Sequence, residues 1–273
     1  MSSHPPFAEL VSVMAKLRAP DGCPWDREQT HQTLKPYLLE EAYEVLEAID
    51  DDRSSDLCSE LGDVLLQVVF HAQVASEDER FSIDDVCQAI VDKLIRRHPH
   101  VFGDTAVDGS DGVVTNWEAI KKAERQSAQE TDPSALDGVP RQLPALLRAQ
   151  RVQEKARRSG FDWQNIEGPL EKMSEEFAEL KEAWQRQTSS QDHVIEEFGD
   201  LLFALVNVGR FLPVVAEDAL RQAVDKFDGR FRAMERIVQE RGQQLADLDL
   251  EAMDAVWDEV KGGPSEPATP SGG

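Results

Sequence analysis

The sequence has few cysteines and no long apolar run, and each shortage excludes a class of protein. Its three cysteines are scattered among 273 residues without a CxxC spacing. Neither a disulfide framework nor a zinc site is therefore expected, and a reducing, cytoplasmic setting is favoured. The longest apolar stretches, such as LLFALVNVG, are much shorter than a membrane span, and the first residues lack the charged-then-apolar pattern of a signal peptide. We therefore expect no membrane association.

Positive charge is also scarce. Lysine and arginine number 29 against 53 aspartate and glutamate residues, which gives a formal net charge of −24. Such a field repels nucleic-acid backbones and anionic membranes, so neither is expected as a partner. A phosphorylated small molecule would need metal ions and a local basic cluster to bind. The GxxxxGK[ST] and GxGxxG patterns are missing as well, which argues against a P-loop or a dinucleotide-binding fold.

What the chain does contain is an internal repeat. EEAYEVLEAI at 40–49 aligns with EEFAELKEAW at 175–184, and SELGDVLLQVV at 59–69 aligns with EEFGDLLFALV at 196–206. Because several matches follow one another in the same order, we infer a duplication. The remaining matches pair CPWD at 23–26 with GFDW at 160–163, 89–98 with 222–231, and 116–122 with 256–262.

The duplication predicts the domain organisation and the fold class. Apolar residues recur at helical spacing in each repeat, and no alternating strand pattern is found. We predict an all-α protein of two duplicated helical-bundle domains, with these apolar stripes in the core. The stripes of the second repeat are Met173, Phe177, Leu180 and Trp184, then Ile195, Phe198, Leu202 and Leu205. The predicted segments are an N-terminal repeat at 1–130, a linker at 131–144, a C-terminal repeat at 145–262 and a disordered tail at 263–273.

Acidic residues at i, i+3 flank each stripe, which places two carboxylates about 5–6 Å apart on one helix. A hairpin of two such helices would bring four together, and each close pair would repel by roughly 3 kcal/mol. Protonation, basic partners or a divalent cation must relieve this repulsion, and an all-oxygen ligand set favours Mg²⁺, with Mn²⁺ as an alternative. Gly62 and Gly199 are expected to permit a close approach by a neighbouring helix or ligand. The predicted ligands are Glu176, Glu179, Glu197 and Asp200 in the second repeat and Glu41, Glu44, Glu60 and Asp63 in the first.

This order of motifs, E-x-x-E followed by a hairpin and E-x-x-D, resembles the all-α nucleoside triphosphate pyrophosphohydrolase superfamily. The segments CPWD, KPYLLEEAYE, ELGDVLLQVVFHAQ and RRHPHVFGD resemble its two-domain MazG-like branch, over nearly the whole chain apart from the tail. The resemblance implies a cytoplasmic, Mg²⁺-dependent homodimer that hydrolyses NTPs and dNTPs to the monophosphate and pyrophosphate. Nucleotide-pool housekeeping or stress control would be its role. A nucleotide-sensing protein that keeps the carboxylates without turnover is the alternative.

The resemblance also implies roles for individual residues. Lys226 and Arg230 would contact the phosphates and Trp257 would adjoin the nucleotide, with Lys261 as a further substrate-binding candidate. Glu175 and Glu176 are both candidates for the catalytic base, and the sequence does not choose between them. The second repeat is expected to carry most of the turnover, because it is more compact and because MazG-like proteins commonly use their C-terminal half.

Overall fold

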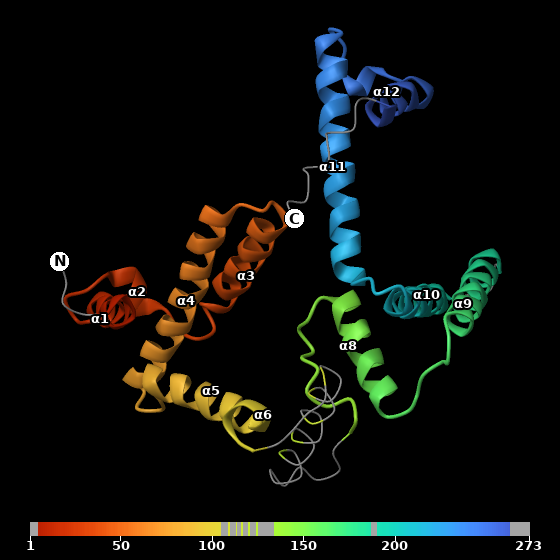
Figure 1. Ribbon diagram of the computed structural model, residues 1–273. Helices are drawn as coiled ribbons and strands as arrows, with labels where there is room; N and C mark the ends of the chain where they lie inside the picture. The colour runs from red at the N-terminus through yellow and green to blue at the C-terminus, as the bar shows by residue number, and fades with distance from the viewer. Residues whose placement is uncertain are drawn as a thin grey trace. The chain divides into compact units, whose positions relative to one another are not determined.

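The computed structural model describes residues 5–104, 109, 113, 116, 120, 124, 134–186 and 190–262, and every regular element within them is a helix (Figure 1). The predicted all-α fold is confirmed. Contacts divide the chain into two compact units, Met1–Glu130 and Thr131–Gly273. The tail predicted at 263–273 lies outside the described residues. In the described part, no single helix is both long and apolar enough to cross a membrane, and one pair of helices that meet at a bend of 102° passes that test only together.

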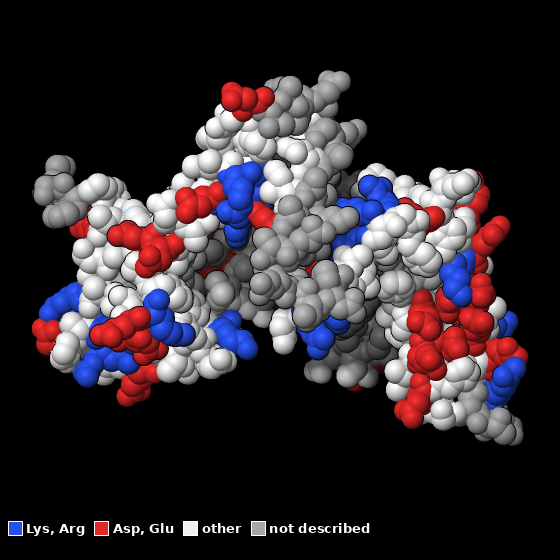
Figure 2. Space-filling model, turned by 90° about the horizontal axis from the view of Figure 1, so that it is seen from below, with Lys and Arg blue, Asp and Glu red and all other residues white. Residues whose placement is uncertain are grey.

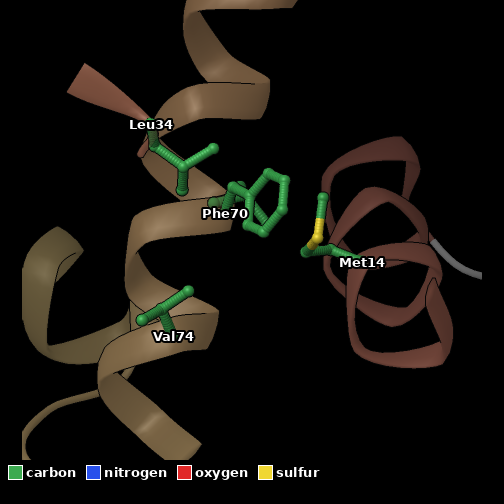
Figure 3. Close-up of a cluster of buried hydrophobic side chains, with 5 residues drawn as sticks. Met14, Leu34, Phe70 and Val74 are labelled. Carbon is green, nitrogen blue, oxygen red and sulfur yellow. The ribbon is translucent and has the colours of Figure 1, made fainter. Parts of the chain in front are cut away.

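The first unit is built around a helical hairpin. Helices α3 and α4 pack along each other, α1 packs on α4, and α5 follows α4. The core forms where α1 meets α4, and Met14, Leu34, Phe70 and Val74 converge there (Figure 3). The helices of this unit are α1 (Pro6–Arg18), α2 (Pro24–Glu28), α3 (Lys35–Asp50), α4 (Ser54–Glu77), α5 (Ile83–Arg97) and α6 (Pro99–Phe102).

Local sequence signals set the helix starts. Ser82 and Asp85 form a capping box at α5, in which the Ser82 hydroxyl accepts from the Asp85 amide and the Asp85 carboxylate accepts from the Ser82 amide at 2.8 Å. Ser190 caps α10 by accepting from the His193 amide. Proline occupies the first turn of α1, α2 and α3, where its missing N–H costs no helical hydrogen bond.

The second unit repeats this plan. Helices α9 and α10 form the hairpin, and α8 packs on α10 as α1 packs on α4. Helix α11 packs on α8 and on α12, which lies toward the opposite end of α11 (Figure 1). Met234, Val238 and Val256 form the small core between α11 and α12. The elements are α8 (Ala145–Arg158), α9 (Glu167–Gln185), α10 (Gln191–Phe211), α11 (Ala216–Glu240), the 3₁₀ helix η1 (Leu245–Asp247) and α12 (Leu250–Gly262).

The predicted apolar stripes do not form the core of this chain. Phe177 is 60% exposed and Trp184 76% exposed, whereas Glu176 and Ala183, each one position earlier, are buried. The reason is that small and polar residues form the contact face of the hairpin and allow α9 and α10 to approach, which turns the bulky stripe outward. Ile195, Phe198 and Leu205 of α10 are likewise more than half exposed.

The close approach expected at the two hairpin glycines is also not found among the described residues. A Cβ atom added at Gly62 or at Gly199 would meet nothing within 4 Å. Both glycines therefore lie beside open space. The exposed apolar side chains of α9 and α10, such as Phe177 and Phe198, are also uncovered.

Candidate functional site

Three of the predicted ligands of the second repeat come together across the hairpin. Helix α9 carries Glu176 and Glu179, α10 carries Glu197, and one carboxylate oxygen of each lies within 4.8 Å of the other two. Figure 2 shows Asp and Glu side chains gathered over the region of α9 and α10. Asp200 is not one of these three, but it lines a pocket together with Glu176. Oxygen-only donors at this spacing suit a hard divalent cation.

The negative charges of this cluster are only partly neutralised by nearby positive charge. Lys172 Nζ lies 2.7 Å from Glu176 Oε1 and 2.9 Å from Glu175 Oε1, and the hydrogen bonds to these two carboxylates raise the pKa of Lys172. Desolvation, followed by repulsion from Glu176, Glu175 and Glu197, raises the pKa of Glu179. Negative charge therefore remains after Lys172 has paired.

The first repeat holds a similar cluster of Glu41, Glu60 and Asp63, whose oxygens also lie within 4.8 Å of one another. Desolvation and then neighbouring carboxylates, Asp63 for the first and Glu44 for the second, raise the pKa values of Glu41 and Glu60. Glu44 is not one of the three and lines a pocket of about 190 Å³ with Glu60. In the alignment of the repeats Tyr37 occupies the position of Lys172, so this cluster has no equivalent lysine.

A pocket of about 290 Å³ adjoins the second cluster, and we call it the α9–α10 pocket. Its walls combine an indole ring, apolar carbons, the Glu176 and Asp200 carboxylates and the Asn207 amide. The lining residues are Trp163, Pro169, Lys172, Glu176, Asp200, Phe203, Ala204 and Asn207.

Two contacts fix the polar and aromatic walls of this pocket. Arg210 donates to the Asn207 side-chain oxygen at 2.8 Å and also pairs with Asp162. Because arginine only donates, the Asn207 oxygen must face it, which leaves the amide nitrogen of Asn207 for a ligand. Gly168 lets the Trp163 ring lie against α9, since a Cβ there would come within 2.1 Å of the indole.

Sequence reasoning missed Lys172, Trp163 and Asn207. Lys172 has the i, i+4 spacing of an ordinary surface ion pair with Glu176, and nothing in the sequence distinguishes it from one. Trp163 carried a signal, because GFDW aligns with CPWD. Asn207 follows Asp200 by seven residues, two helical turns, and so lies on the same face of α10.

The predicted substrate-binding residues lie elsewhere in the unit, on α11 and α12. Lys226 and Arg230 are one turn apart on α11, and neither has a hydrogen bond or ion pair among the described residues. Trp257 packs against Phe227 with ring centroids 5.2 Å apart, and Lys261 pairs with Asp258. Within the described chain, none of these side chains bonds to the carboxylates of α9 and α10.

The basic pair of the first repeat differs from that of the second. Arg97 is held by Glu124 at 2.7 Å, and the arginine hydrogen bonds lower the pKa of Glu124 to about 2. Arg97 is thus already neutralised, unlike its counterpart Arg230. Trp117, the counterpart of Trp257, lies outside the described residues.

Comparison with known proteins finds one family for both repeats and for the whole chain. The MazG nucleotide pyrophosphohydrolase domain matches residues 29–102 and again residues 164–234. A nucleoside triphosphate pyrophosphohydrolase of Escherichia coli K12 is 50% identical over 253 residues, 92% of this chain and 95% of the relative. The nucleoside triphosphate pyrophosphohydrolase/pyrophosphatase MazG of Thermotoga maritima is 50% identical over 258 residues, 94% and 96% of the two chains. The uncharacterized protein YabN of Bacillus subtilis is 47% identical over 93% of this chain but only 51% of its own length.

Proposed function

Because the chain belongs to the MazG nucleotide pyrophosphohydrolase family, we propose that it hydrolyses nucleoside and deoxynucleoside triphosphates to the monophosphate and pyrophosphate. The observation that carries this proposal is the three-carboxylate cluster of Glu176, Glu179 and Glu197 beside the α9–α10 pocket. An acidic cluster next to a pocket with an aromatic wall suits a substrate whose phosphates arrive with a metal ion and whose base needs a flat apolar surface.

A divalent cation, Mg²⁺ or Mn²⁺, fits the donor set of this site. The carboxylates are close enough for mutual repulsion to contribute to the raised pKa of Glu179, and Lys172 alone does not balance them. Glu176, Glu179 and Glu197 would hold the ion, with Asp200 completing the set from α10. When bound, the ion supplies neutralisation of the phosphate charge and a lower pKa for a coordinated water.

The residues around the cluster divide the remaining tasks. Trp163 offers its ring to the base, and the Asn207 amide nitrogen donates to a carbonyl of the base or to a sugar hydroxyl. Glu175 lies outside the three-carboxylate group but next to it. We therefore assign Glu175 as the general base that accepts a proton from the attacking water. Lys172 holds Glu175 and Glu176 in place. Attack at the α-phosphorus then releases pyrophosphate without a covalent enzyme intermediate.

The active form in this proposal is a homodimer. The two hairpin helices expose several large apolar side chains that a soluble monomer would rarely leave in water, namely Phe177 and Trp184 on α9 and Ile195 and Phe198 on α10. Lys226 and Arg230 have no anionic partner in the described chain. A second copy that covers these apolar side chains could bring its own Lys226 and Arg230 to the phosphates. The unpaired state of all three cysteines suits work in the reducing cytoplasm.

Product analysis tests the proposal. With Mg²⁺ present, chromatography of a reaction on several NTPs and dNTPs should show monophosphate and pyrophosphate in equal amounts, and EDTA should abolish both. Diphosphate plus orthophosphate would contradict attack at the α-phosphorus. Nucleotide binding with no turnover in either metal would instead favour a nucleotide-sensing protein.

A further inference from the structure

The second unit has another pocket, of about 470 Å³, which is positively charged although the chain as a whole is strongly negative. It lies between α8, the end of α10 and the segment that leads into α11. Four arginines and a single carboxylate line it, in a protein whose net charge is −24. We call it the arginine pocket, and its lining residues are Gln150, Arg151, Glu154, Arg157, Arg158, Arg210, Pro213, Val214 and Val215.

Among the described residues, Arg157 is the arginine of this pocket without a bonded counter-charge. Arg151 pairs with Glu154 at 2.8 Å, and Arg210 pairs with Asp162. The Arg157 side chain makes no hydrogen bond or ion pair among the described residues, although its charge helps to lower the pKa of Asp162. Because guanidinium groups gathered at one pocket repel one another, an anion that entered would be attracted by charge the protein leaves unbalanced.

A buried polar atom in the wall gives a second, independent indication of a ligand. Gln150 is only 8% exposed, and its side-chain oxygen is buried without a hydrogen-bond partner. Its amide nitrogen reaches Glu154 at 3.5 Å. A buried acceptor with no partner among the described residues costs free energy, and a hydroxyl group of a ligand would satisfy it.

We propose that the arginine pocket binds a phosphate-bearing anion, at a site separate from the carboxylate cluster. Arginine forks bind phosphate oxygens by paired, charge-assisted hydrogen bonds, and Arg151 and Arg157 are exposed enough to turn toward a ligand. A protonated phosphate oxygen or a sugar hydroxyl would supply the donor that Gln150 lacks. This inference does not rest on the proposed hydrolysis, because it uses none of the residues assigned to that reaction.

One hydrogen bond links the arginine pocket to the α9–α10 pocket. Arg210 lines the arginine pocket and also holds Asn207, which lines the α9–α10 pocket. An anion that drew Arg210 toward itself would compete with Asp162 and Asn207 for the same guanidinium. Anion binding is therefore expected to change the position of Asn207 in the proposed nucleoside site, because Arg210 contacts both pockets.

Calorimetric titration of inorganic pyrophosphate into the full chain tests the proposal, in EDTA and about 0.15 M salt so that metal-dependent binding and long-range attraction are suppressed. Saturable binding of one anion per chain is expected. The double variant Arg151→Gln/Arg157→Gln should weaken it by about tenfold or more, because two charge-assisted contacts are lost. Arg210 is left intact, since its nearly buried ion pair with Asp162 supports the fold.

Matched controls separate this site from general attraction. Arg186→Gln and Arg232→Gln each remove an exposed arginine that pairs with a carboxylate outside the pocket, and both should leave the affinity unchanged. No saturable binding by the wild type, or equal weakening by these controls, would overturn the proposal. So would binding that survives in the double variant but is lost in Lys226→Ala, because the anion would then occupy the proposed substrate site.

Discussion

Lys172 Nζ lies 2.7 Å from Glu176 Oε1, so the nearly buried glutamate of the carboxylate cluster is neutralised by a lysine one helical turn earlier. The same ammonium group lies 2.9 Å from Glu175. The chain thus carries a cation of its own where the proposal requires a metal ion, and this explains how the carboxylates can coexist before an ion binds.

Replacing Lys172 with methionine should show that this lysine neutralises Glu176 when no metal ion is bound. In EDTA the free energy of unfolding should fall by about 1–2 kcal/mol, because Glu176 loses its partner. With saturating Mg²⁺ the deficit should shrink, since the ion takes over the neutralisation. Urea unfolding under both conditions measures the difference. The control is Lys181→Met, since this lysine of the same helix has no ion pair with any described residue. An equal loss in EDTA and in Mg²⁺ would show that Lys172 has no part in the metal site.

Gly168→Ala should disturb the aromatic wall of the α9–α10 pocket. A Cβ at this position would come within 2.1 Å of the Trp163 indole, so the ring must move. We expect KM for nucleotides to rise several-fold with a smaller change in kcat, because only base contacts are lost. Gly62→Ala is the matched control, since a Cβ there meets nothing within 4 Å. If both alanine variants keep the wild-type KM, the Trp163 ring does not bind the base.

Much of this architecture could be predicted from the sequence. The repeated E-x-x-E and E-x-x-D patterns identified the hairpins, because helical periodicity and i, i+3 spacing are local properties of the chain. They also named the residues of both carboxylate clusters, together with Glu44 and Asp200, which lie outside the two groups of three. The packing of α1 on α4 and of α8 on α10 extends the duplication to helices that no sequence match had covered.

What the sequence could not supply depends on which face of a helix meets another. The stripe of Phe177 and Trp184 has ideal core periodicity, yet the neighbouring face with Glu176 and Ala183 is the buried one. Helical periodicity predicts that a helix has an apolar face, but it does not predict which other surface packs against that face. Lys172 and the shared bonds of Arg210 were invisible for a related reason, because each depends on contacts that an ordinary surface residue could equally make.

The first unit should lose stability in mild acid. Arg80 donates to His31 Nε2, so His31 Nδ1 carries the hydrogen and donates to His71 Nδ1 at 2.8 Å. Burial, followed by the electrostatic effect of the neighbouring His31 ring, lowers the pKa of His71. The unfolded chain therefore takes up protons first as pH falls below about 6.5, and the free energy of unfolding decreases with it.

Hydrogen exchange of α4 peptides between pH 7.5 and 5.5, corrected for the intrinsic exchange rate, measures this loss. The variant His71→Phe removes the titrating ring and should flatten the pH dependence, and His193→Phe in the second unit should not. A pH dependence that persists unchanged in His71→Phe would contradict the assignment.

The dimer proposal predicts complementation between inactive variants. Lys226→Ala and Glu179→Gln should each lower kcat/KM at least about tenfold. If the partner copy supplies Lys226, a mixture refolded together should recover about a quarter of wild-type activity, because half of the dimers then hold one intact site. A 30.6 kDa species in light scattering, or no recovery in the mixture, would contradict a site shared between copies.

A matched pair of variants tests whether the carboxylate cluster of the second repeat performs the hydrolysis. Glu179→Gln and Glu44→Gln change equivalent positions of the two repeats by the same atom replacement, and Asp200→Asn with Asp63→Asn forms a second such pair. Steady-state release of pyrophosphate from dNTPs in Mg²⁺ is measured for each, with circular dichroism to verify the fold. We expect Glu179→Gln to lose most of the activity and Glu44→Gln to keep most of it. A larger loss in Glu44→Gln would assign the chemistry to the first repeat instead.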